Sequence, residues 1–388
     1  DLKKIVILGS TGSIGKSTID IIKLQKDRSQ KVVGLVADTS VEELDMQLDL
    51  FPGAKFALGS EDALSRLKAR RKDVPVRSAG TGAEGIINLL RETAPDLVVN
   101  GLVGIAGLSP TLEALRLGCM VALANKETLV TGGELLTRDQ RSLERIIPVD
   151  SEHFSLSQCL ERSREGVSEI ILTASGGPFY NLDNSELKDV SIQQVLNHPT
   201  WDMGDRVTVD SAMLLNKGFE VIEAHFLFGF SYRDIRVIIH PQSLVHSLVR
   251  LKDSSLLAHI GPADMKLPII NALYYPEKVK FPWKALQLED TGALEFIRFD
   301  SSNFPAFELA MDAARQGGTS LAVLNAADEM AVKTFLAGNI GFLDIIDWIE
   351  DALSNHSTAE VSGISDIIEA DRWARDFLAS RHDEAVKI

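Results

Sequence analysis

The stretch RIIPVDSEHF, residues 145–154, places two carboxylates directly after a short apolar run. If that run ends a strand, side chains two residues apart leave the same face, so Asp150 and Glu152 converge while Ser151 points away. Two carboxylates at such a distance repel each other unless a proton, a basic side chain or a cation lies between them. The pair therefore predicts a third group in its neighbourhood.

A second set of polar residues lies in VDSAMLLNKGFEVIEA, residues 209–224. The pattern predicts a helix that starts near Ser211, and Asn216 and Glu220, four residues apart, share one face of it. A hydroxyl, an amide and the adjacent ammonium of Lys217 at one helix start are typical of a phosphate site. Glu220 could join the first pair as a third carboxylate, and three such oxygen ligands suit Mg²⁺ or Mn²⁺.

Two further segments resemble ligand-binding loops. The run EIILTASGGPF, residues 169–179, reads as a strand that ends in Ser175 and two glycines, where a hydroxyl and backbone amides could hold an anion. The segment from His198 to Asp205 combines proline, glycine and the lone Trp201 in a polar setting, which is typical of a mobile lid. A structured loop around a buried Trp201 is the alternative.

The beginning of the chain, KKIVILGSTGSIGKSTIDII at residues 3–22, reads as a buried strand, a glycine-rich turn and a helix. Glycines at every third position let the backbone turn tightly and let a pyrophosphate reach the helix start, although a tight turn without a ligand is the alternative. The next strand, KVVGLVA, favours dinucleotide binding. The groups that would face the cofactor belong to Thr11, Gly12, Ser13 and Ile14.

The alternation of strands and helices continues through PDLVVNGLVG, TLEALRLG and MVALANKETLV. It predicts a doubly wound parallel sheet, whose ligands lie beyond the carboxyl ends of the strands. Asn125, Lys126 and Glu127 stand at such an end, and the next strand brings Asp150 and Glu152 to the same edge. As alternatives, Asn125 could cap the next helix, and Lys126 with Glu127 could form a solvated pair.

Composition excludes several other classes of protein. With 388 residues the chain is long enough for two or three domains, and its net charge of -15 argues against binding nucleic acid or anionic membranes. No apolar run approaches the roughly 18 to 20 residues that span a bilayer. The two cysteines, Cys119 and Cys159, form no motif, which is typical of a reducing compartment. We expect a cytoplasmic protein, or a plastid one if an upstream transit peptide was removed before Asp1.

The motifs together resemble one enzyme family, the 1-deoxy-D-xylulose 5-phosphate reductoisomerases of the non-mevalonate isoprenoid pathway. The matching blocks, in the family's order, are GSTGSIG, ANKET, PVDSEH, SGGPF, HPTWDMG, VDSAMLLNKGFEVIEA, HPQSLVHSLV and AVLNAADEMAV. The resemblance implies a homodimer with an NADPH-binding domain, a central α+β catalytic domain carrying the lid, and a carboxyl-terminal helical bundle. We place these domains at residues 1–150, 151–280 and 304–388, with a linker at 281–303. Amphipathic segments stopped by glycine also favour the terminal helices.

The resemblance also assigns roles to single residues. It implies that Asp150, Glu152 and Glu220 hold a divalent cation, which is then the third group that the carboxylate pair requires. Substrate contacts fall on Lys126, Ser151, Ser175, His198, Trp201, Ser211, Asn216, Lys217 and Glu220. Of these, Ser175, Ser211, Asn216 and Lys217 bind the phosphate. Cofactor contacts near the nicotinamide fall on Asn125, Glu127 and Gly204.

The implied reaction turns 1-deoxy-D-xylulose 5-phosphate into 2-C-methyl-D-erythritol 4-phosphate with hydride from NADPH. Its path passes through an enediolate, whose developing charge a bound metal and Lys126 would stabilise. The chief alternative is a semialdehyde or sugar-phosphate dehydrogenase with Cys119 or Cys159 as nucleophile, but neither cysteine lies in a glycine- or serine-rich turn at a strand end. A non-catalytic cofactor-binding regulator would have no use for a three-carboxylate site beside a phosphate site.

The chain departs from this family after its second strand. There the family has small, basic or polar residues that grip the 2′-phosphate of NADPH, whereas this chain has Asp38, Thr39 and Ser40. An acid at this strand end normally binds a free ribose hydroxyl and repels a phosphate. We expect NADPH with an unusually small preference over NADH. In the alternative, Asp38 caps the following helix while Thr39 and Ser40 bind the phosphate.

Overall fold

The structure is a computed structural model that describes residues 2–24, 29–72, 77–182, 186–198, 201 and 203–383. The lid residues 199, 200 and 202, and the end of the predicted helical domain, 384–388, lie outside the described residues. The chain forms two compact units. The first comprises Asp1–Thr128, Asp139–Phe154 and Asp264–Trp283, and the second comprises Leu129–Arg138, Ser155–Ala263 and Lys284–Ile388.

The first unit is built on a parallel sheet of seven strands, as the alternating sequence pattern predicts. The strand order is β4-β3-β2-β1-β5-β6-β7, so the order reverses between β1 and β5, where doubly wound sheets bind ligands. The strands are β1 Lys3–Leu8, β2 Gln30–Ala37, β3 Lys55–Leu58, β4 Ser78–Thr81, β5 Leu97–Asn100, β6 Met120–Leu123 and β7 Ile146–Pro148.

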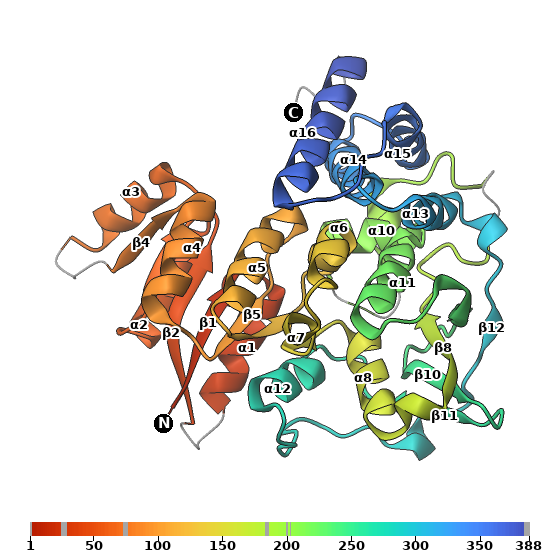
Figure 1. The fold of residues 1–388 in the computed structure, drawn as a ribbon, viewed down its shortest axis with the longest axis horizontal. Coiled ribbons are helices and arrows are strands. Elements are labelled where there is room, and N and C mark those ends of the chain that lie inside the picture. The colour runs from red at the N-terminus through yellow and green to blue at the C-terminus, as the bar shows by residue number, and fades with distance from the viewer. Residues whose placement is uncertain are drawn as a thin grey trace. The chain divides into compact units, whose positions relative to one another are not determined.

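Helices cover both faces of this sheet, and its central strand β1 is apolar and fully buried from Ile5 to Leu8. In β1, Ile5 and Ile7 pack into a core shared with α1, α2, α3 and α12, whereas Val6 lies on the opposite face near Leu89 of α4. Such two-sided burial explains the continuous apolar run in the sequence. The helices are α1 Ser13–Leu24, α2 Val41–Leu50, α3 Glu61–Arg70, α4 Gly82–Thr93, α5 Leu108–Arg116, α7 Gln140–Leu143 and α12 Lys266–Tyr274 (Figure 1).

The second unit contains a mixed sheet of five strands in the order β11-β10-β8-β9-β12. Only β8 and β9 pair in parallel, and the other pairs are antiparallel. The strands are β8 Val167–Ala174, β9 Ile235–Ile239, β10 Val245–Leu251, β11 Leu256–Ile260 and β12 Ile297–Arg298. Ahead of the terminal helices, this unit contains α9 Ile192–Val195, α10 Asp205–Ala212 and α11 Leu215–Phe228. Two further helices, α6 Glu127–Leu136 and α8 Ser151–Ser163, begin in the first unit and continue into the second.

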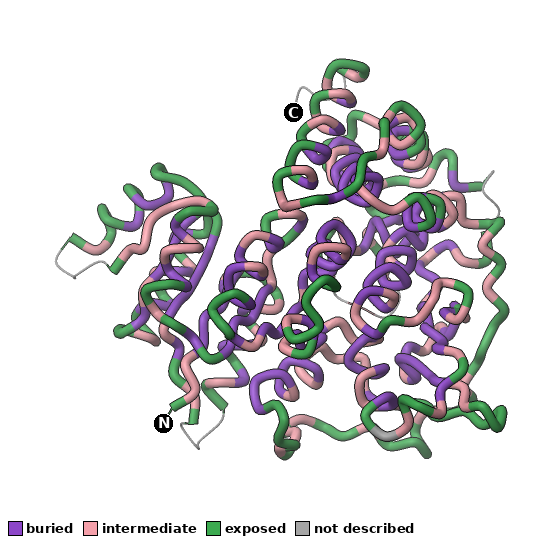
Figure 2. Tube along the Cα trace, viewed as in Figure 1, coloured by how far each residue is buried: buried purple, intermediate pink, exposed green. Residues whose placement is uncertain are grey.

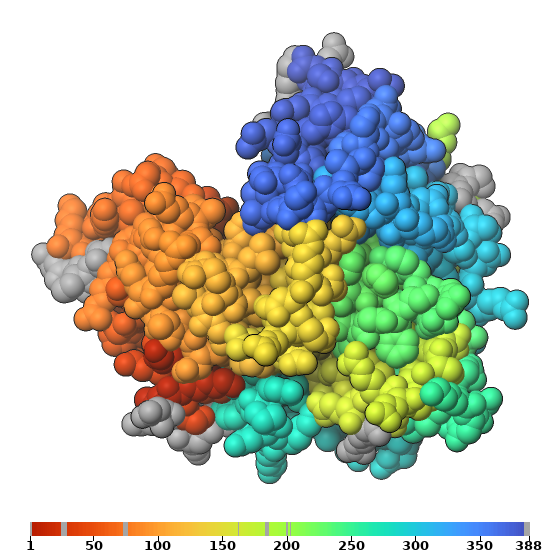
Figure 3. All heavy atoms as spheres, in the orientation of Figure 1, coloured from red at the N-terminus to blue at the C-terminus, as the bar shows by residue number. Residues whose placement is uncertain are grey.

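The chain ends in helices, as the amphipathic segments stopped by glycine predict. They are α13 Pro305–Gln316, α14 Ser320–Leu336, α15 Asp344–Asn355 and α16 Ile364–Arg381. Proline opens α13 and Gly317, with a φ of 68°, ends it. Figure 2 shows α11 and α14 largely buried, and the terminal helices, in blue, form one compact body in Figure 3. No helix among the described residues is long and apolar enough to span a membrane.

The two units interleave along the chain, whereas the sequence predicts consecutive domains. Residues 264–283 return to the first unit, because Ile269, Ile270 and Leu273 of α12 pack into the core of its sheet. The segment predicted as a linker, 281–303, contributes β12 to the edge of the five-stranded sheet. The three predicted domains stay a prediction.

Candidate functional site

The carboxyl ends of the neighbouring strands β6 and β7 bring Lys126 and Asp150 together. Lys126 Nζ lies 2.9 Å from Asp150 Oδ2, and the two side chains are only 10% and 11% exposed. His153 Nδ1 lies 3.2 Å from the other carboxylate oxygen. Burial alone would raise the pKa of Asp150, but Lys126 and His153 outweigh it and hold that pKa well below its usual value. Asp150 is therefore an anion, and Lys126 is not a solvated surface residue.

Glu152 approaches Asp150 for a different reason from the one that the sequence suggests. The strand ends at Pro148 and α8 begins at Ser151, so Glu152 lies in the first turn of a helix. Carboxylate oxygens of Asp150 and Glu152 still lie within 4.8 Å of each other. The prediction that Ser151 points away is wrong, because its hydroxyl donates to the Glu152 carboxylate. The helix start also favours the negative charge of Glu152.

Asn125 connects the loop after β5 to the start of α6. Its amide nitrogen donates to the carbonyl oxygens of Leu102 and Gly104, 2.9 Å away in each case, and to Glu127 Oε2 at 3.1 Å. Its amide oxygen accepts from the backbone nitrogen of Thr128 at 2.9 Å, so Asn125 caps α6, as the alternative interpretation proposes. Glu127 is buried and cannot be a solvated surface acid.

In the glycine-rich turn, two glycines have no room for a side chain, and the third has room for one. A Cβ at Gly9, whose φ is +75°, would lie 2.6 Å from the carbonyl oxygen of Gly101, and a Cβ at Gly15 would lie 2.4 Å from that of Gly9. Gly12 is exposed, and a Cβ there would make only an ordinary contact at 3.4 Å. The helix α1 begins at Ser13. The turn is therefore shaped by its own packing and remains open for an anion at the helix start.

Asp38 follows β2 and does not cap α2, so the capping part of that alternative is wrong, while phosphate binding by Thr39 and Ser40 stays a prediction. The N-cap position belongs to Ser40, whose side chain makes no capping hydrogen bond. The carboxylate of Asp38 turns toward the end of β3, because a Cβ at Gly59 would lie 1.8 Å from Asp38 Oδ1. Asp38, Thr39 and Ser40 are all exposed.

In the second unit, the end of β8 forms the predicted small-residue turn. Gly176 and Gly177 have φ values of 89° and 68°, and Gly177 N donates to Ser175 Oγ at 3.2 Å. His198 Nδ1 accepts from the backbone nitrogen of Trp201 at 3.0 Å, so its proton is on Nε2, which lies 3.0 Å from Ser175 Oγ. Burial lowers the pKa of His198. The ring is therefore a neutral donor aimed at the turn.

The helix predicted to start near Ser211 is two helices. Ser211 lies in the last turn of α10, and Leu214, with a φ of 57°, separates α10 from α11. The prediction of Ser211 at the helix start is wrong, because the left-handed residue Leu214 breaks the periodic run. A Cβ at Gly177 would lie 2.6 Å from the carbonyl oxygen of Ser211, so the end of α10 contacts the turn after β8.

The first two turns of α11 carry the remaining predicted residues. Asn216 Nδ2 donates to Glu220 Oε1 at 2.6 Å, and Lys217 Nζ donates to Glu220 Oε2. The side chains of Lys217 and Glu220 are 4% and 3% exposed. The prediction that Asn216 and Glu220 share a face is confirmed. Gly204, the predicted cofactor contact, is the exposed N-cap residue of α10.

Sequence reasoning missed Arg206, which lies in the first turn of α10 and contacts residues of α14. The four-residue spacing of Arg206 and Asp210 was the local signal for an ion pair on this helix, and Arg206 Nε lies 3.7 Å from Asp210 Oδ2.

A doubly wound sheet with a glycine-rich turn, joined to a second unit with buried carboxylates and lysines, defines a dinucleotide-dependent enzyme of the Rossmann-like class. Three family models match: 1-deoxy-D-xylulose 5-phosphate reductoisomerase at residues 5–133, the C-terminal domain of that name at 146–228, and the DXP reductoisomerase C-terminal domain at 260–377. The chain belongs to the 1-deoxy-D-xylulose 5-phosphate reductoisomerase family.

Curated relatives agree over nearly the whole length. The enzyme of that name from Desulfitobacterium hafniense (strain DSM 10664 / DCB-2) is 43% identical over 96% of this chain and 98% of the relative. The one from Crocosphaera subtropica is 45% identical over 97% of this chain and 95% of the relative.

Solved structures agree as well. A crystal structure of DOX-P reductoisomerase in complex with NADPH, fosmidomycin and magnesium has a TM-score of 0.91 and 35% identity, and covers 100% of this chain and 98% of its own. The Zymomonas mobilis enzyme in complex with NADPH has a TM-score of 0.88 and 35% identity, with 98% and 99% covered.

Proposed function

We propose that the chain converts 1-deoxy-D-xylulose 5-phosphate into 2-C-methyl-D-erythritol 4-phosphate with NADPH and a divalent cation. The observation that carries this proposal is the pairing of buried carboxylates with lysines, Asp150 with Lys126 and Glu220 with Lys217, in a chain of this family. The solved relatives hold NADPH and magnesium, which supports the same two cofactors here.

The ligands of the cation are Asp150, Glu152 and Glu220. Their chemistry fits Mg²⁺ or Mn²⁺, because these hard cations prefer carboxylate oxygens and water. Asp150 is ionised and Glu152 lies beside it within 4.8 Å, which is a repulsive arrangement that a cation relieves. When bound, the cation supplies a Lewis acid to the substrate oxygens.

The chain's own residues then bind and orient the substrate. Lys126 holds a positive charge beside Asp150, where it stabilises negative charge that develops on the substrate, and the hydroxyl of Ser151 contacts the substrate hydroxyl groups. The phosphate is bound by Ser175, Ser211, Asn216 and Lys217. These contacts are remote from the reacting carbons, so their binding energy holds the fragments together during rearrangement.

His198 contributes as a neutral hydrogen-bond donor. Because Trp201 N fixes the proton on Nε2 and burial lowers its pKa, His198 donates toward the phosphate-binding Ser175. The lid residues Trp201 and Met203 cover the substrate and exclude water.

Residues at the carboxyl edge of the parallel sheet would hold the cofactor. Thr11, Gly12, Ser13 and Ile14 in the open turn would bind its pyrophosphate, and Asp38, Thr39 and Ser40 would bind its adenosine ribose. Asn125, Glu127 and Gly204 contact the nicotinamide side. The protein aims the hydride, and the cofactor supplies it.

The protein acts as a homodimer in the cytoplasm, or in the plastid stroma if an upstream transit peptide is removed. Support for the dimer comes from β11, an edge strand whose Leu256, Leu257 and Ile260 are 47%, 37% and 40% exposed. An exposed apolar edge strand is prone to association, and a second copy would cover it.

A steady-state assay with substrate, metal and cofactor varied separately tests the proposal. We expect oxidation of NADPH that requires 1-deoxy-D-xylulose 5-phosphate and Mg²⁺ or Mn²⁺. Oxidation with a simple aldehyde and no metal would instead support the dehydrogenase alternative, and no turnover with any of them would support a regulator.

A further inference from the structure

Arg206 clamps the first turn of α10 onto α14. Its Nη2 donates to Asp328 Oδ2 at 2.7 Å and to Asn325 Oδ1 at 2.9 Å, and its Nη1 donates to Glu329 Oε1 at 2.9 Å. Its Nε also donates to Asp328 Oδ2 at 3.1 Å. The side chain is 13% exposed, so these are strong, largely desolvated contacts. All three nitrogens of the guanidinium are used on one neighbouring helix.

The clamp extends to α16 through a second arginine. Arg375 Nη2 donates to the other oxygen of Glu329, and Arg375 Nε donates to Asp371 Oδ2 at 2.8 Å. Burial alone would raise the pKa of Glu329, but Arg206 and Arg375 outweigh it and hold that pKa below its usual value. Glu329 is thus an anion held between two arginines, which makes the support beneath α10 rigid.

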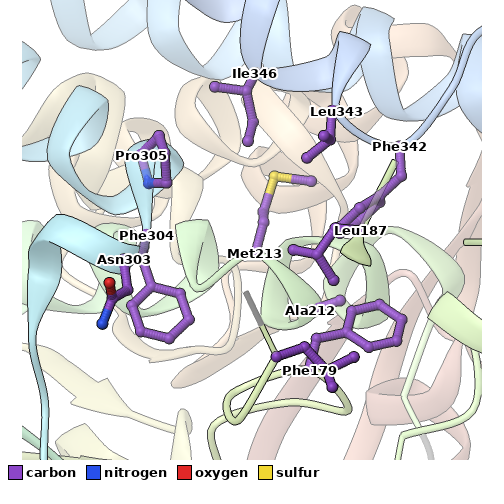
Figure 4. A pocket seen from close by; sticks show the side chains of 11 residues that line it. Phe179, Leu187, Ala212, Met213, Asn303, Phe304, Pro305, Phe342, Leu343 and Ile346 are labelled. Atoms are coloured by element: carbon purple, nitrogen blue, oxygen red, sulfur yellow. The ribbon is translucent and has the colours of Figure 1, made fainter. Parts of the chain in front are cut away.

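The other end of α10 faces α15 and the segment before it across a small apolar pocket. Ala212 and Met213 line a small pocket with Phe342, Leu343 and Ile346, which precede or belong to α15 (Figure 4). Phe179, which follows the turn after β8, contributes to the wall of this pocket, and its ring centroid lies 5.8 Å from that of Phe342.

The helix that is held in this way bears directly on the phosphate site. It begins directly after Gly204 and carries Ser211 in its last turn, against Gly177. A small rotation or shift of α10 would therefore move Ser211 relative to the turn of Ser175.

We propose that Arg206 is a positioning residue for recognition of the substrate phosphate, acting through α10 on Ser211. This inference rests on the proposed function, because it concerns the phosphate group of the same substrate. Arg206 itself does not touch the substrate, and a guanidinium fork suits the task because it holds several acceptors in fixed directions.

The test is Arg206→Lys, which keeps the positive charge and loses the fork. We expect kcat/KM for 1-deoxy-D-xylulose 5-phosphate to fall roughly tenfold, as one weakened charge-assisted contact would cause. The Kd for NADPH, measured by fluorescence titration without substrate, should change much less, because Gly204 before α10 is a single proposed cofactor contact and the others lie in the first unit. Arg315→Lys on α13, whose side chain is 61% exposed, is the matched control and should leave both values unchanged.

Glu329→Gln is a second variant, which keeps the shape of the side chain and removes one negative charge. It replaces Arg206→Lys in the same measurements if that variant does not fold. We expect a smaller loss of kcat/KM in the same direction. A lowered melting temperature with unchanged kcat/KM in the folded variants would overturn the inference, as would an equal loss of NADPH binding. Absence of turnover in the unmodified protein would instead refute the proposed function.

Discussion

Among the described residues, two sets of buried or largely buried carboxylates differ in their cationic partners. In the candidate site, Asp150 is paired with Lys126 and Glu220 with Lys217. Beneath α10, by contrast, the carboxylates of Asp328 and Glu329 are paired with Arg206, and Glu329 also with Arg375. Both sets are largely removed from water, so a carboxylate in either set needs a positive charge beside it to stay ionised.

The type of cationic partner determines which set of carboxylates can change partners during a reaction. An ammonium is a compact point charge on a flexible stem, so a metal ion or a substrate group can take its place at modest cost. A guanidinium that holds several acceptors at once is pre-organised and costly to displace. We infer that the lysine-paired carboxylates serve chemistry, and that the arginine-paired ones hold the helices that carry it.

The largest effect is expected from removal of the cation that the lysine-paired carboxylates are expected to bind. Treatment with EDTA should abolish turnover, and added Mg²⁺ or Mn²⁺ should restore it, because Asp150, Glu152 and Glu220 require a cation. Activity is measured as NADPH oxidation before and after chelation. Full activity in a thoroughly chelated sample would mean that Lys126 and Lys217 remain the partners of these carboxylates during the reaction.

Substitution of one carboxylate of that set should also have a large effect. Glu220→Gln should lower kcat at least about a hundredfold, the order expected for one electrostatic contributor to the transition state. The exposed Glu161→Gln on α8 is the control for loss of a carboxylate and should keep its rate. A near-normal kcat for Glu220→Gln would make Glu220 a structural residue of α11.

The arginine-paired set should respond in stability. Arg206→Met should lower the free energy of unfolding by about 3 kcal/mol, because it leaves the buried Asp328 carboxylate without its partner. Thermal unfolding measures this loss as a lower melting temperature. Arg315→Met, which removes a 61% exposed arginine, should change stability by no more than about 0.5 kcal/mol. Equal melting temperatures for the two variants would remove the distinction drawn here.

Local signals explain what could be predicted from the sequence. The parallel sheet and the glycine-rich turn were predictable because apolar strands and glycines at close contacts are constraints of neighbouring residues. The break at Leu214 was not, since a leucine with a φ of 57° has no local signature. The clamp of Arg206 joins residues 122 positions apart, and the return of α12 to the first unit is equally non-local. Such features depend on packing that no short pattern records.

Substitution of the lid residues should have a smaller effect on catalysis than loss of the lysine-paired carboxylates. His198→Ala and Trp201→Ala should each lower kcat/KM for the substrate by roughly fivefold to tenfold, as the loss of about one hydrogen bond would cause. The melting temperature should hold, because both residues lie in a loop that contributes little to the core. Unchanged kinetics in both variants would mean that the segment is an ordinary loop and not a lid.

The smallest effect is expected at Asp38, a carboxylate that belongs to neither set. It is exposed at the end of β2, with Oδ1 turned toward Gly59, and its position is where an acid accepts hydrogen bonds from a ribose 2′-hydroxyl. We expect a small preference for NADPH over NADH, because a missing charge-assisted phosphate contact costs about 1.5 to 3 kcal/mol, roughly one to two decades of discrimination.

Asp38→Gly should raise the ratio of kcat/KM for NADPH to that for NADH by no more than about fivefold, because repulsion from an exposed, screened charge is weak. Asp38→Asn keeps the shape and removes only the charge, so it separates repulsion from loss of the ribose contact. If charge is the cause, both variants should shift the ratio alike; if the ribose contact is the cause, only Asp38→Gly should weaken NADH. A preference for NADPH beyond about a thousandfold in the unmodified protein, unaffected by either substitution, would show that Asp38 does not face the ribose.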